Sequence, residues 1–175
     1  MNKKLLIVGA GTYAHLVYEI ACETGRFQKI CFVDDQKTEA PTGERVIGGI
    51  HDLPSLSEIY TDVIVAVGNP DIRLQLLDQI KSIGNLHIET LISPRAYVAP
   101  SAVIAEGSIV EPFAVIHTRC VVKRGCLISA GAVVNHESIC EEAVHIDCNA
   151  TVPGYTTVAA KTKVPCGTVY LSKTE

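Results

Sequence analysis

The sequence predicts a small α/β parallel sheet over residues 1–90, followed by a three-sided parallel β-helix over residues 91–175. In the first half, short Val, Ile and Leu runs alternate with segments of helical spacing, as in parallel strands joined by crossover helices. In the second half, an aliphatic residue recurs at every sixth position, which is typical of a solenoid. The chain has 175 residues, 47% hydrophobic and 19% charged, so it can bury one core or two small ones and is expected to fold.

The predicted sheet begins the chain. Its strands are expected at Leu5–Val8, Ile30–Val33 and Val63–Val67. Thr12 is expected to cap a first helix that ends near Gly25. Asn69 followed by Pro70 is a cap and first-turn pair, and the helix after it should run to Gly84.

A tight turn in this half has the character of a phosphate-binding loop. Gly9, Ala10 and Gly11 lie between the first strand and the first helix, where backbone amides face an anion. Asp34 and Asp35 end the second strand, where an acid typically holds a ribose in a Rossmann-like fold. Roughly ninety residues fit one nucleotide better than a dinucleotide. The alternative is structural: Gly11 only permits the turn, and Asn69 only caps its helix.

The six-residue repeat is the strongest signal in the chain. Its aliphatic positions are Ile92, Val98, Ile104, Val110, Ile116, Val122, Ile128, Val134, Cys140, Ile146, Val152, Val158 and Val164, of which only Cys140 is not a branched aliphatic. Four residues after each comes a small or short side chain, from Ala96 to Thr168. Three hexapeptides make one triangular coil, so positions 18 apart should stack at roughly 4.8 Å.

One residue pair stands out because the repeat does not require it. His136 is followed by Glu137 in a segment with little other charge, and a nearby carboxylate orients an imidazole. Gly154 lies 18 residues further on and should stack one coil above His136. A glycine there leaves a backbone N–H beside the imidazole, which is the geometry of a general base with an oxyanion donor.

The whole chain resembles the hexapeptide-repeat acetyltransferases that include sialic acid O-acetyltransferases and nucleotide-amino-sugar N-acetyltransferases (NeuD/PglD-like). The resemblance runs through V-G-A-G, F-V-D-D, A-V-G-N-P-D-I-R, the hexapeptides and N-H-E. It implies a left-handed β-helix and direct transfer of an acetyl group from acetyl-CoA. The implied acceptor is an amino or hydroxyl group of a nucleotide-activated sugar, such as a bacillosamine precursor, or of sialic acid.

The resemblance also assigns roles to individual residues. His136 would be the general base, Glu137 its carboxylate partner, and Gly154 the oxyanion amide. His145 would lie near the acetyl-CoA thioester. The nucleotide-sugar acceptor would be held by Gly9, Ala10, Gly11, Asp34, Asp35, Gly68, Asn69 and Arg73.

Composition limits the partners. The formal net charge is −4 with scattered Lys and Arg, so nucleic acid is not expected as a partner. No apolar run near the start approaches a membrane span, so we expect a soluble, cytoplasmic protein. The seven cysteines include no C-x-x-C pair, which favours reduced thiols and predicts no metal site. Outward-facing aliphatics predict an oligomer, and the resemblance implies a homotrimer.

Two other functions are open from the sequence. One is a non-catalytic nucleotide-sugar-binding or scaffolding protein with a reduced coenzyme A site. The other is a β-helical metal lyase, which needs three histidines around zinc. His117, His136 and His145 lack the close pair expected for that site.

Overall fold

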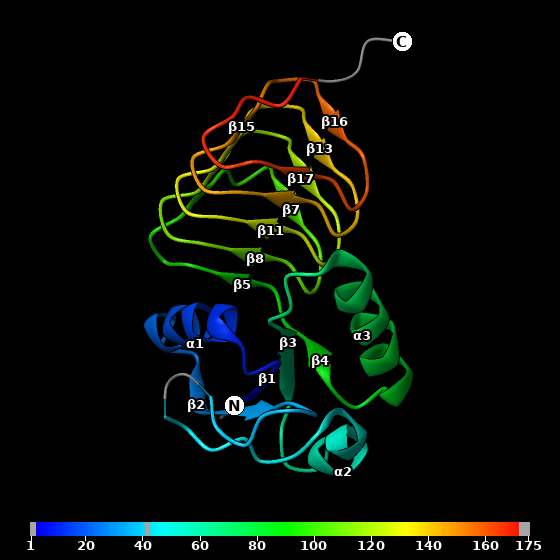
Figure 1. The fold of residues 1–175 in the computed structure, drawn as a ribbon. Helices are drawn as coiled ribbons and strands as arrows, with labels where there is room; N and C mark the ends of the chain where they lie inside the picture. Colours follow the sequence, from blue (N-terminus) through cyan, green and yellow to red (C-terminus); the bar gives the residue numbers. More distant parts are fainter. Residues whose placement is uncertain (1–2, 41–42, 172–175) are drawn as a thin grey trace. The chain divides into compact units, whose positions relative to one another are not determined.

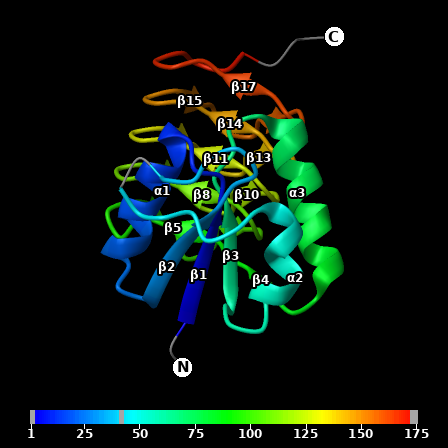
Figure 2. The same cartoon turned by 60° about the horizontal axis from the view of Figure 1, so that its bottom comes forward.

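The computed structural model describes residues 3–40 and 43–171, and the chain divides into two compact units, Met1–Glu89 and Thr90–Glu175 (Figure 1). In the first unit four parallel strands form one sheet in the order β2-β1-β3-β4 (Figure 2). The strands are β1 (Lys3–Val8), β2 (Phe27–Val33), β3 (Asp62–Val65) and β4 (His87–Ile88). The three predicted strands are therefore confirmed, and the fourth, short strand was not predicted.

Helices cover both faces of this sheet. They are α1 (Thr12–Glu23), the 3₁₀ turn η1 (Ile50–Asp52), α2 (Leu53–Leu56) and α3 (Pro70–Ile83). In Figure 1, α1 and α2 lie on opposite sides of the sheet. None of the helices in the described residues is long and apolar enough to cross a membrane.

The helix ends match the predictions with one exception. The Asn69 side chain accepts hydrogen bonds from the backbone of Asp71 and Ile72 at 3.0 and 3.1 Å, and Gly84 ends α3 in the left-handed conformation. The prediction that Thr12 caps α1 is wrong. Gly11 has the extended backbone of the N-cap and Thr12 is already helical, because the tight turn after β1 ends one residue earlier than expected.

Alternation along the strands builds the core of this unit. Leu6 and Val8 of β1, with Val63 and Val65 of β3, belong to one buried cluster with side chains from α2 and α3. Neighbouring strand residues point to the other face of the sheet. Burial of each such aliphatic side chain contributes about 1.5–3 kcal/mol, so packing of these helices holds the sheet together.

An ion-pair network joins β1, β3 and the segment after β4. Lys3 Nζ lies 2.9 Å from Asp62 Oδ1 and 3.2 Å from Glu89 Oε2. Arg26 Nη1 lies 3.1 Å from Glu89 Oε1. His87 Nδ1 lies 3.2 Å from Asp62 Oδ1. Asp62, His87 and Glu89 are the one group of potential metal ligands found among the described residues, and Lys3 already supplies a cation to both carboxylates.

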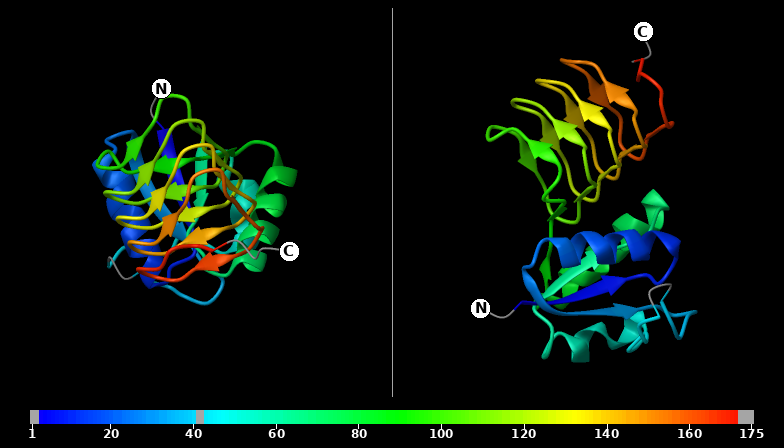
Figure 3. Two further views of the ribbon diagram at one scale, coloured as in Figure 1. Left: turned by 90° about the horizontal axis from the view of Figure 1, so that it is seen from above. Right: turned by 90° about the vertical axis from the view of Figure 1, so that its left-hand side faces the viewer.

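The second unit is a left-handed parallel β-helix, with thirteen two-residue strands, β5 to β17, in its described residues. They are Leu91–Ile92, Tyr97–Val98, Val103–Ile104, Ile109–Val110, Val115–Ile116, Val121–Val122, Leu127–Ile128, Val133–Val134, Ile139–Cys140, His145–Ile146, Thr151–Val152, Thr157–Val158 and Lys163–Val164. They form three sheets, ordered β16-β13-β10-β7, β17-β14-β11-β8-β5 and β15-β12-β9-β6. Figure 3 shows the strands stacked coil upon coil. The register pairs residues 18 apart, such as Val133 with Thr151, which confirms the predicted repeat.

The turns between strands from Gly107 onward share one conformation. Every sixth residue from Gly107 to Gly167 has a positive φ, between 55° and 73°. Glycine adopts this left-handed conformation at little cost, whereas an L-residue pays roughly 1–2 kcal/mol. Four of these positions are glycine, and the others carry side chains, including Arg119, Glu137 and Tyr155.

The aliphatic column forms the interior of the β-helix. From Val110 to Val164 its members are at most 1% exposed, and the predicted small residues pack among them. The outward-facing aliphatics behave less uniformly. Val103 is 59% exposed, whereas Ile109 and Leu127 are buried.

Candidate functional site

His136 and Gly154 lie at the same corner of the β-helix, one coil apart. His136 follows β12 and Gly154 follows β15, and these two strands are paired in one sheet. A β-carbon added to Gly154 would lie 2.9 Å from His136 Cε1, 3.0 Å from Nε2 and 3.3 Å from Nδ1. A β-carbon at residue 154 would therefore collide with the imidazole ring. Only glycine leaves room for the ring in this position.

The backbone N–H of Gly154 is available as a hydrogen-bond donor. One coil below, the N–H of His136 donates to the side chain of Asn135 at 2.8 Å. Residue 153 is proline, which offers no side-chain acceptor. Within the described part of the chain the Gly154 N–H has no hydrogen-bond acceptor. The corner therefore combines an exposed imidazole with an open amide donor, the two groups that acyl transfer requires.

The carboxylate of Glu137 is directed to a different partner from the one expected. It forms a hydrogen-bonded ion pair with Arg119, one coil below. No hydrogen bond joins it to the His136 ring in the described part of the structure. The reason is the turn geometry: Glu137 has the left-handed conformation (φ 59°), and its side chain follows the stack of residues 18 positions apart. The expected pairing of Glu137 with the imidazole is thus corrected to an Arg119–Glu137 pair.

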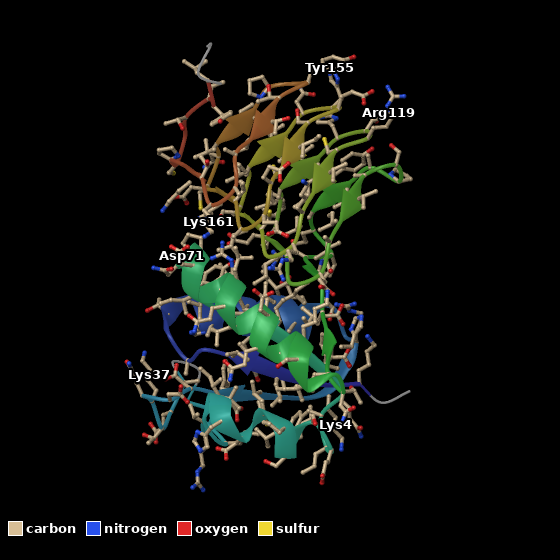
Figure 4. All side chains as sticks on the ribbon, turned by 90° about the vertical axis from the view of Figure 1, so that its right-hand side faces the viewer. Lys4, Lys37, Asp71, Arg119, Tyr155 and Lys161 are labelled. Carbon is tan, nitrogen blue, oxygen red and sulfur yellow. The ribbon has the colours of Figure 1, made fainter. Side chains whose placement is uncertain are left out.

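Tyr155 completes this corner. Its ring contacts the His136 ring edge-to-face, with centroids 5.0 Å apart and an interplanar angle of 85°. Figure 4 shows Tyr155 and Arg119 at one edge of the β-helix and Lys161 at another. Neither Arg119 nor Tyr155 was predicted from the sequence, although both lie 18 residues from Glu137, so the repeat contained the signal.

His145 lies away from this corner within one chain. It belongs to β14, in the sheet formed by β17, β14, β11, β8 and β5. Its Nε2 is 3.1 Å from Ser129 Oγ and 3.9 Å from Asp147 Oδ1. Nine residues separate His145 from His136, which is half a coil, so the two imidazoles are on different faces. His145 therefore does not line the His136 corner of its own chain.

The first unit contains a cavity at the carboxyl ends of its strands. It has a volume of about 620 Å³ and adjoins a smaller one of about 220 Å³. Asp34, Asp35, Ile50, Ile72 and Leu76 line both. The remaining lining residues are Gly49, His51, Gln75 and Gln79 in the larger cavity, and Val8, Gly9, Gln36 and Val67 in the smaller. This is the edge at which open α/β sheets bind ligands.

Three of the expected acceptor residues, Gly9, Asp34 and Asp35, line this cavity. Asp34 Oδ2 accepts from Ala10 N at 2.8 Å, and Asp34 Oδ1 accepts from the amides of Gln36 and Lys37 at 2.8 and 3.0 Å. Asp34 therefore ties the loop after β1 to the loop after β2, and this bond occupies the Ala10 amide. Gly9 has a φ of 104° and its added β-carbon would lie 3.2 Å from Ala66 O, so glycine is needed for the turn itself.

The five other expected acceptor residues, Ala10, Gly11, Gly68, Asn69 and Arg73, do not line the cavity. Arg73 is fully buried, and its Nη1 donates to the carbonyls of Val67 and Gly68 at 2.8 and 2.7 Å. Asn69 caps α3 and Gly11 is the N-cap of α1. These residues hold the loops in place, because a buried guanidinium and an N-cap both satisfy backbone groups that would otherwise lack partners.

The cavity is also lined by residues that the sequence did not predict as site residues. Ile50, His51, Ile72, Gln75 and Gln79 line it. Gln75 and Gln79 are four residues apart on α3, hence on one helix face. His51 and Ile50 come from the η1 turn, which carries no periodic pattern and gave no signal.

A search among curated proteins gives no match, but a family model and solved structures do. The family model of the PglD N-terminal domain matches residues 4–80. The acetyltransferase domain of PglB from Neisseria gonorrhoeae, solved with acetyl coenzyme A, is 35% identical, with a TM-score of 0.92, 97% of this chain covered and 82% of that one. The chain belongs to the PglD-like hexapeptide-repeat acetyltransferase family.

Other solved proteins share this fold. A mutant of perosamine N-acetyltransferase from Caulobacter crescentus, in complex with CoA and GDP-perosamine, is 25% identical, with a TM-score of 0.83, covering 96% of this chain and 88% of that one. WeeI from Acinetobacter baumannii shares the fold at 16% identity and a TM-score of 0.70, over 96% of this chain and 88% of that chain. The similarity of this chain to the solved acetyltransferases thus extends over both of its units.

Proposed function

We propose that this protein transfers an acetyl group from acetyl-CoA to an amine of a nucleotide-activated sugar, with His136 as the general base. The observation that carries the proposal is the pairing of the exposed His136 imidazole with the open N–H of Gly154. It is supported by family membership and by relatives solved with acetyl coenzyme A, or with CoA and GDP-perosamine.

In the proposed reaction the sugar amine attacks the thioester carbonyl directly. His136 takes the proton that the nitrogen loses as the C–N bond forms, and the N–H of Gly154 donates to the developing oxyanion. Collapse of the tetrahedral intermediate breaks the C–S bond. The leaving thiolate takes the proton from His136, and coenzyme A is released as the thiol. No acyl-enzyme is required. Burial raises the pKa of the Cys120 and Cys140 thiols, which disfavours either as a nucleophile.

The first unit is proposed to hold the acceptor nucleotide. The cavity bounded by Asp34, Asp35 and Ile72 combines carboxylates for a ribose with an apolar wall for a base. Gly9, Ala10, Gly11, Gly68, Asn69 and Arg73 would contribute by fixing the loops around it. Asp35 Oδ1 accepts from Ile50 N at 2.7 Å, and the Asp35 side chain is exposed and thus accessible to a ligand.

We further propose that the enzyme is a cytoplasmic homotrimer. The apolar outward positions that are still accessible in one chain, such as Val103 at 59%, support an interface between copies. Because His145 lies half a coil from His136, its contribution to the donor site would come through a neighbouring copy. Sedimentation of the purified protein tests the assembly: a single species of three times the chain mass is expected, and a monomer would contradict it.

Acetyl transfer is tested by mass spectrometry of the products formed from acetyl-CoA and a panel of UDP- and GDP-linked amino sugars, with sialic acid as the hydroxyl acceptor. His136→Ala should reduce kcat by about 10²–10⁴-fold. His117→Ala is the matched control, because His117 is also an exposed histidine of the β-helix and should keep its activity. If nucleotide sugars bind but no acceptor is acetylated in a His136-dependent way, the protein is the non-catalytic binding module instead.

A further inference from the structure

The orientation of the His136 ring depends on few contacts. Gly154 lies close to the ring, and Tyr155 contacts it edge-to-face with the ring centroids 5.0 Å apart. The Glu137 carboxylate, which would ordinarily orient such a ring, is engaged by Arg119. Rotation of the imidazole about its own side-chain bond is soft, so a general base in this position needs another group to hold it.

Tyr155 is attached rigidly to the same corner. Its backbone N–H donates to the carbonyl of His136 at 3.0 Å. The side chain therefore extends from a turn that is anchored on the very residue it contacts. A tyrosine ring has only two rotatable side-chain bonds, so it loses little entropy on taking a fixed position.

The backbone at Tyr155 carries a cost that glycine would avoid. Its φ is 57°, and of the eleven equivalent turns from residue 107 to residue 167 four use glycine and seven carry a side chain. At the corner of His136, the left-handed positions of three successive coils are instead Arg119, Glu137 and Tyr155. Strained backbone that is kept together with large side chains, beside a reactive group, points to a role for those side chains.

We propose that Tyr155 is a positioning residue that holds the His136 imidazole for proton transfer through its edge-to-face ring contact. The inference rests on the proposed function. Tyr155 acts through the ring of His136 and takes no part in bond making. The hydroxyl is not required, because the contact is between the two rings.

Steady-state kinetics of Tyr155→Leu and Tyr155→Phe test the role. Leucine removes the aromatic contact, and kcat should fall about 3- to 10-fold, the rate equivalent of one aromatic pair, with the KM values of both substrates unchanged. Phenylalanine should restore kcat to within about twofold of the parent. Phe113→Leu is the matched control, because Phe113 is also an exposed aromatic with a left-handed backbone (φ 64°) and lies at another corner.

A second readout does not depend on turnover. In NMR spectra of protein labelled at histidine, the Cε1–H resonance of His136 should shift in Tyr155→Leu and stay close to its parent position in Tyr155→Phe and Phe113→Leu. An unchanged kcat and an unchanged resonance in Tyr155→Leu would overturn the inference. Equal losses in the leucine and phenylalanine variants would also overturn it, since the hydroxyl would then be the active group. If activity survives in His136→Ala, the proposed function itself is wrong, and this result is distinct from the outcomes for Tyr155.

Discussion

The imidazole of His136 lies against the α-carbon of Gly154 so closely that a β-carbon there would be 2.9 Å from Cε1. This contact makes residue 154 a sensitive test of the site. Gly154 does not have a left-handed backbone, so alanine is tolerated by the chain and its only conflict is with the imidazole. Gly154→Ala should therefore displace the ring and lower kcat by about 100-fold, as expected when a catalytic group is misplaced by about 1 Å.

Gly131 provides the opposite case. It has a φ of 69° and faces the Asn149 side chain, at a corner away from His136. Gly131→Ala should lower the free energy of unfolding by about 1–2 kcal/mol through backbone strain, with kcat unchanged. Urea unfolding and steady-state kinetics on both glycine variants separate the two effects. Equal kcat values for the two variants would show that the His136–Gly154 contact has no part in catalysis.

Asp34 and Asp35 are adjacent, but we expect different consequences when each is changed to asparagine. Asp34 accepts three backbone N–H bonds on two oxygens, and an amide cannot replace both acceptors. Asp34→Asn should cost about 1–3 kcal/mol of stability. Asp35 accepts one such bond, which the asparagine oxygen preserves, so Asp35→Asn should keep the melting temperature.

The effect of Asp35→Asn should appear in binding instead. Its exposed carboxylate lines the cavity, so the KM for the nucleotide sugar should rise roughly tenfold while the KM for acetyl-CoA stays constant. Calorimetric melting curves and substrate titrations of the two variants measure this contrast. A KM for the sugar that does not change would remove Asp35 from the acceptor site.

Asp62 makes the free energy of unfolding depend on pH in the acidic range. Burial alone would raise the pKa of this carboxyl, but hydrogen bonds from Thr61, Lys3 and His87 outweigh it and hold the pKa below its ordinary value of 3.8. A group with a lowered pKa stabilises the fold above its unfolded-state pKa and loses that contribution as the pH falls through the folded-state pKa. Asp62→Asn should thus cost about 1–3 kcal/mol near pH 7, and the difference from the parent should shrink below pH 3.8.

Chemical denaturation at several pH values between 7 and 3 measures this difference. Glu58→Gln is the control, because Glu58 is an exposed carboxylate outside the network. A gap between Asp62→Asn and the parent that is constant with pH would show that the lost packing, and not the charge of Asp62, causes the destabilisation.

Cys148 and Cys166 report on the register of the last coils. His145 pairs with Lys163 and Ile146 with Val164, and Gly167 N donates to Cys148 O at 2.9 Å, so the two cysteines stack in successive coils. Their α-carbons should be roughly 4.8 Å apart, within the range of a disulfide. Treatment with diamide should link them, with the loss of two hydrogens detected by mass spectrometry of the tryptic peptides. Cys166→Ser should abolish the link, and a link from Cys148 to any other cysteine would contradict the register.

The sequence by itself determined the β-helix and the alignment of its coils. Each hexapeptide carries one aliphatic residue and one small residue, and burying both in a narrow interior leaves a single repeating geometry. The stacking of His136 under Gly154 follows from that register, and so does the stacking of Arg119, Glu137 and Tyr155, although only the first was recognised. In the α/β unit, the strands predicted at Leu5–Val8 and Val63–Val67 and the helix after Asn69 were equally evident from apolar runs and capping residues.

Tertiary structure alone decided where individual side chains point and which backbone groups they satisfy. The pairing of Glu137 with Arg119, and not with His136, depends on a left-handed turn that directs the side chain along the stack. The family resemblance assigns Arg73 to the nucleotide-sugar acceptor, but the fold buries its guanidinium on the carbonyls of Val67 and Gly68. Ile50 and His51 line the cavity from η1. This segment has no periodic hydrophobic pattern that could have predicted them. Local patterns specify which face of an element is buried, whereas hydrogen-bond partners are chosen by groups far apart in the chain.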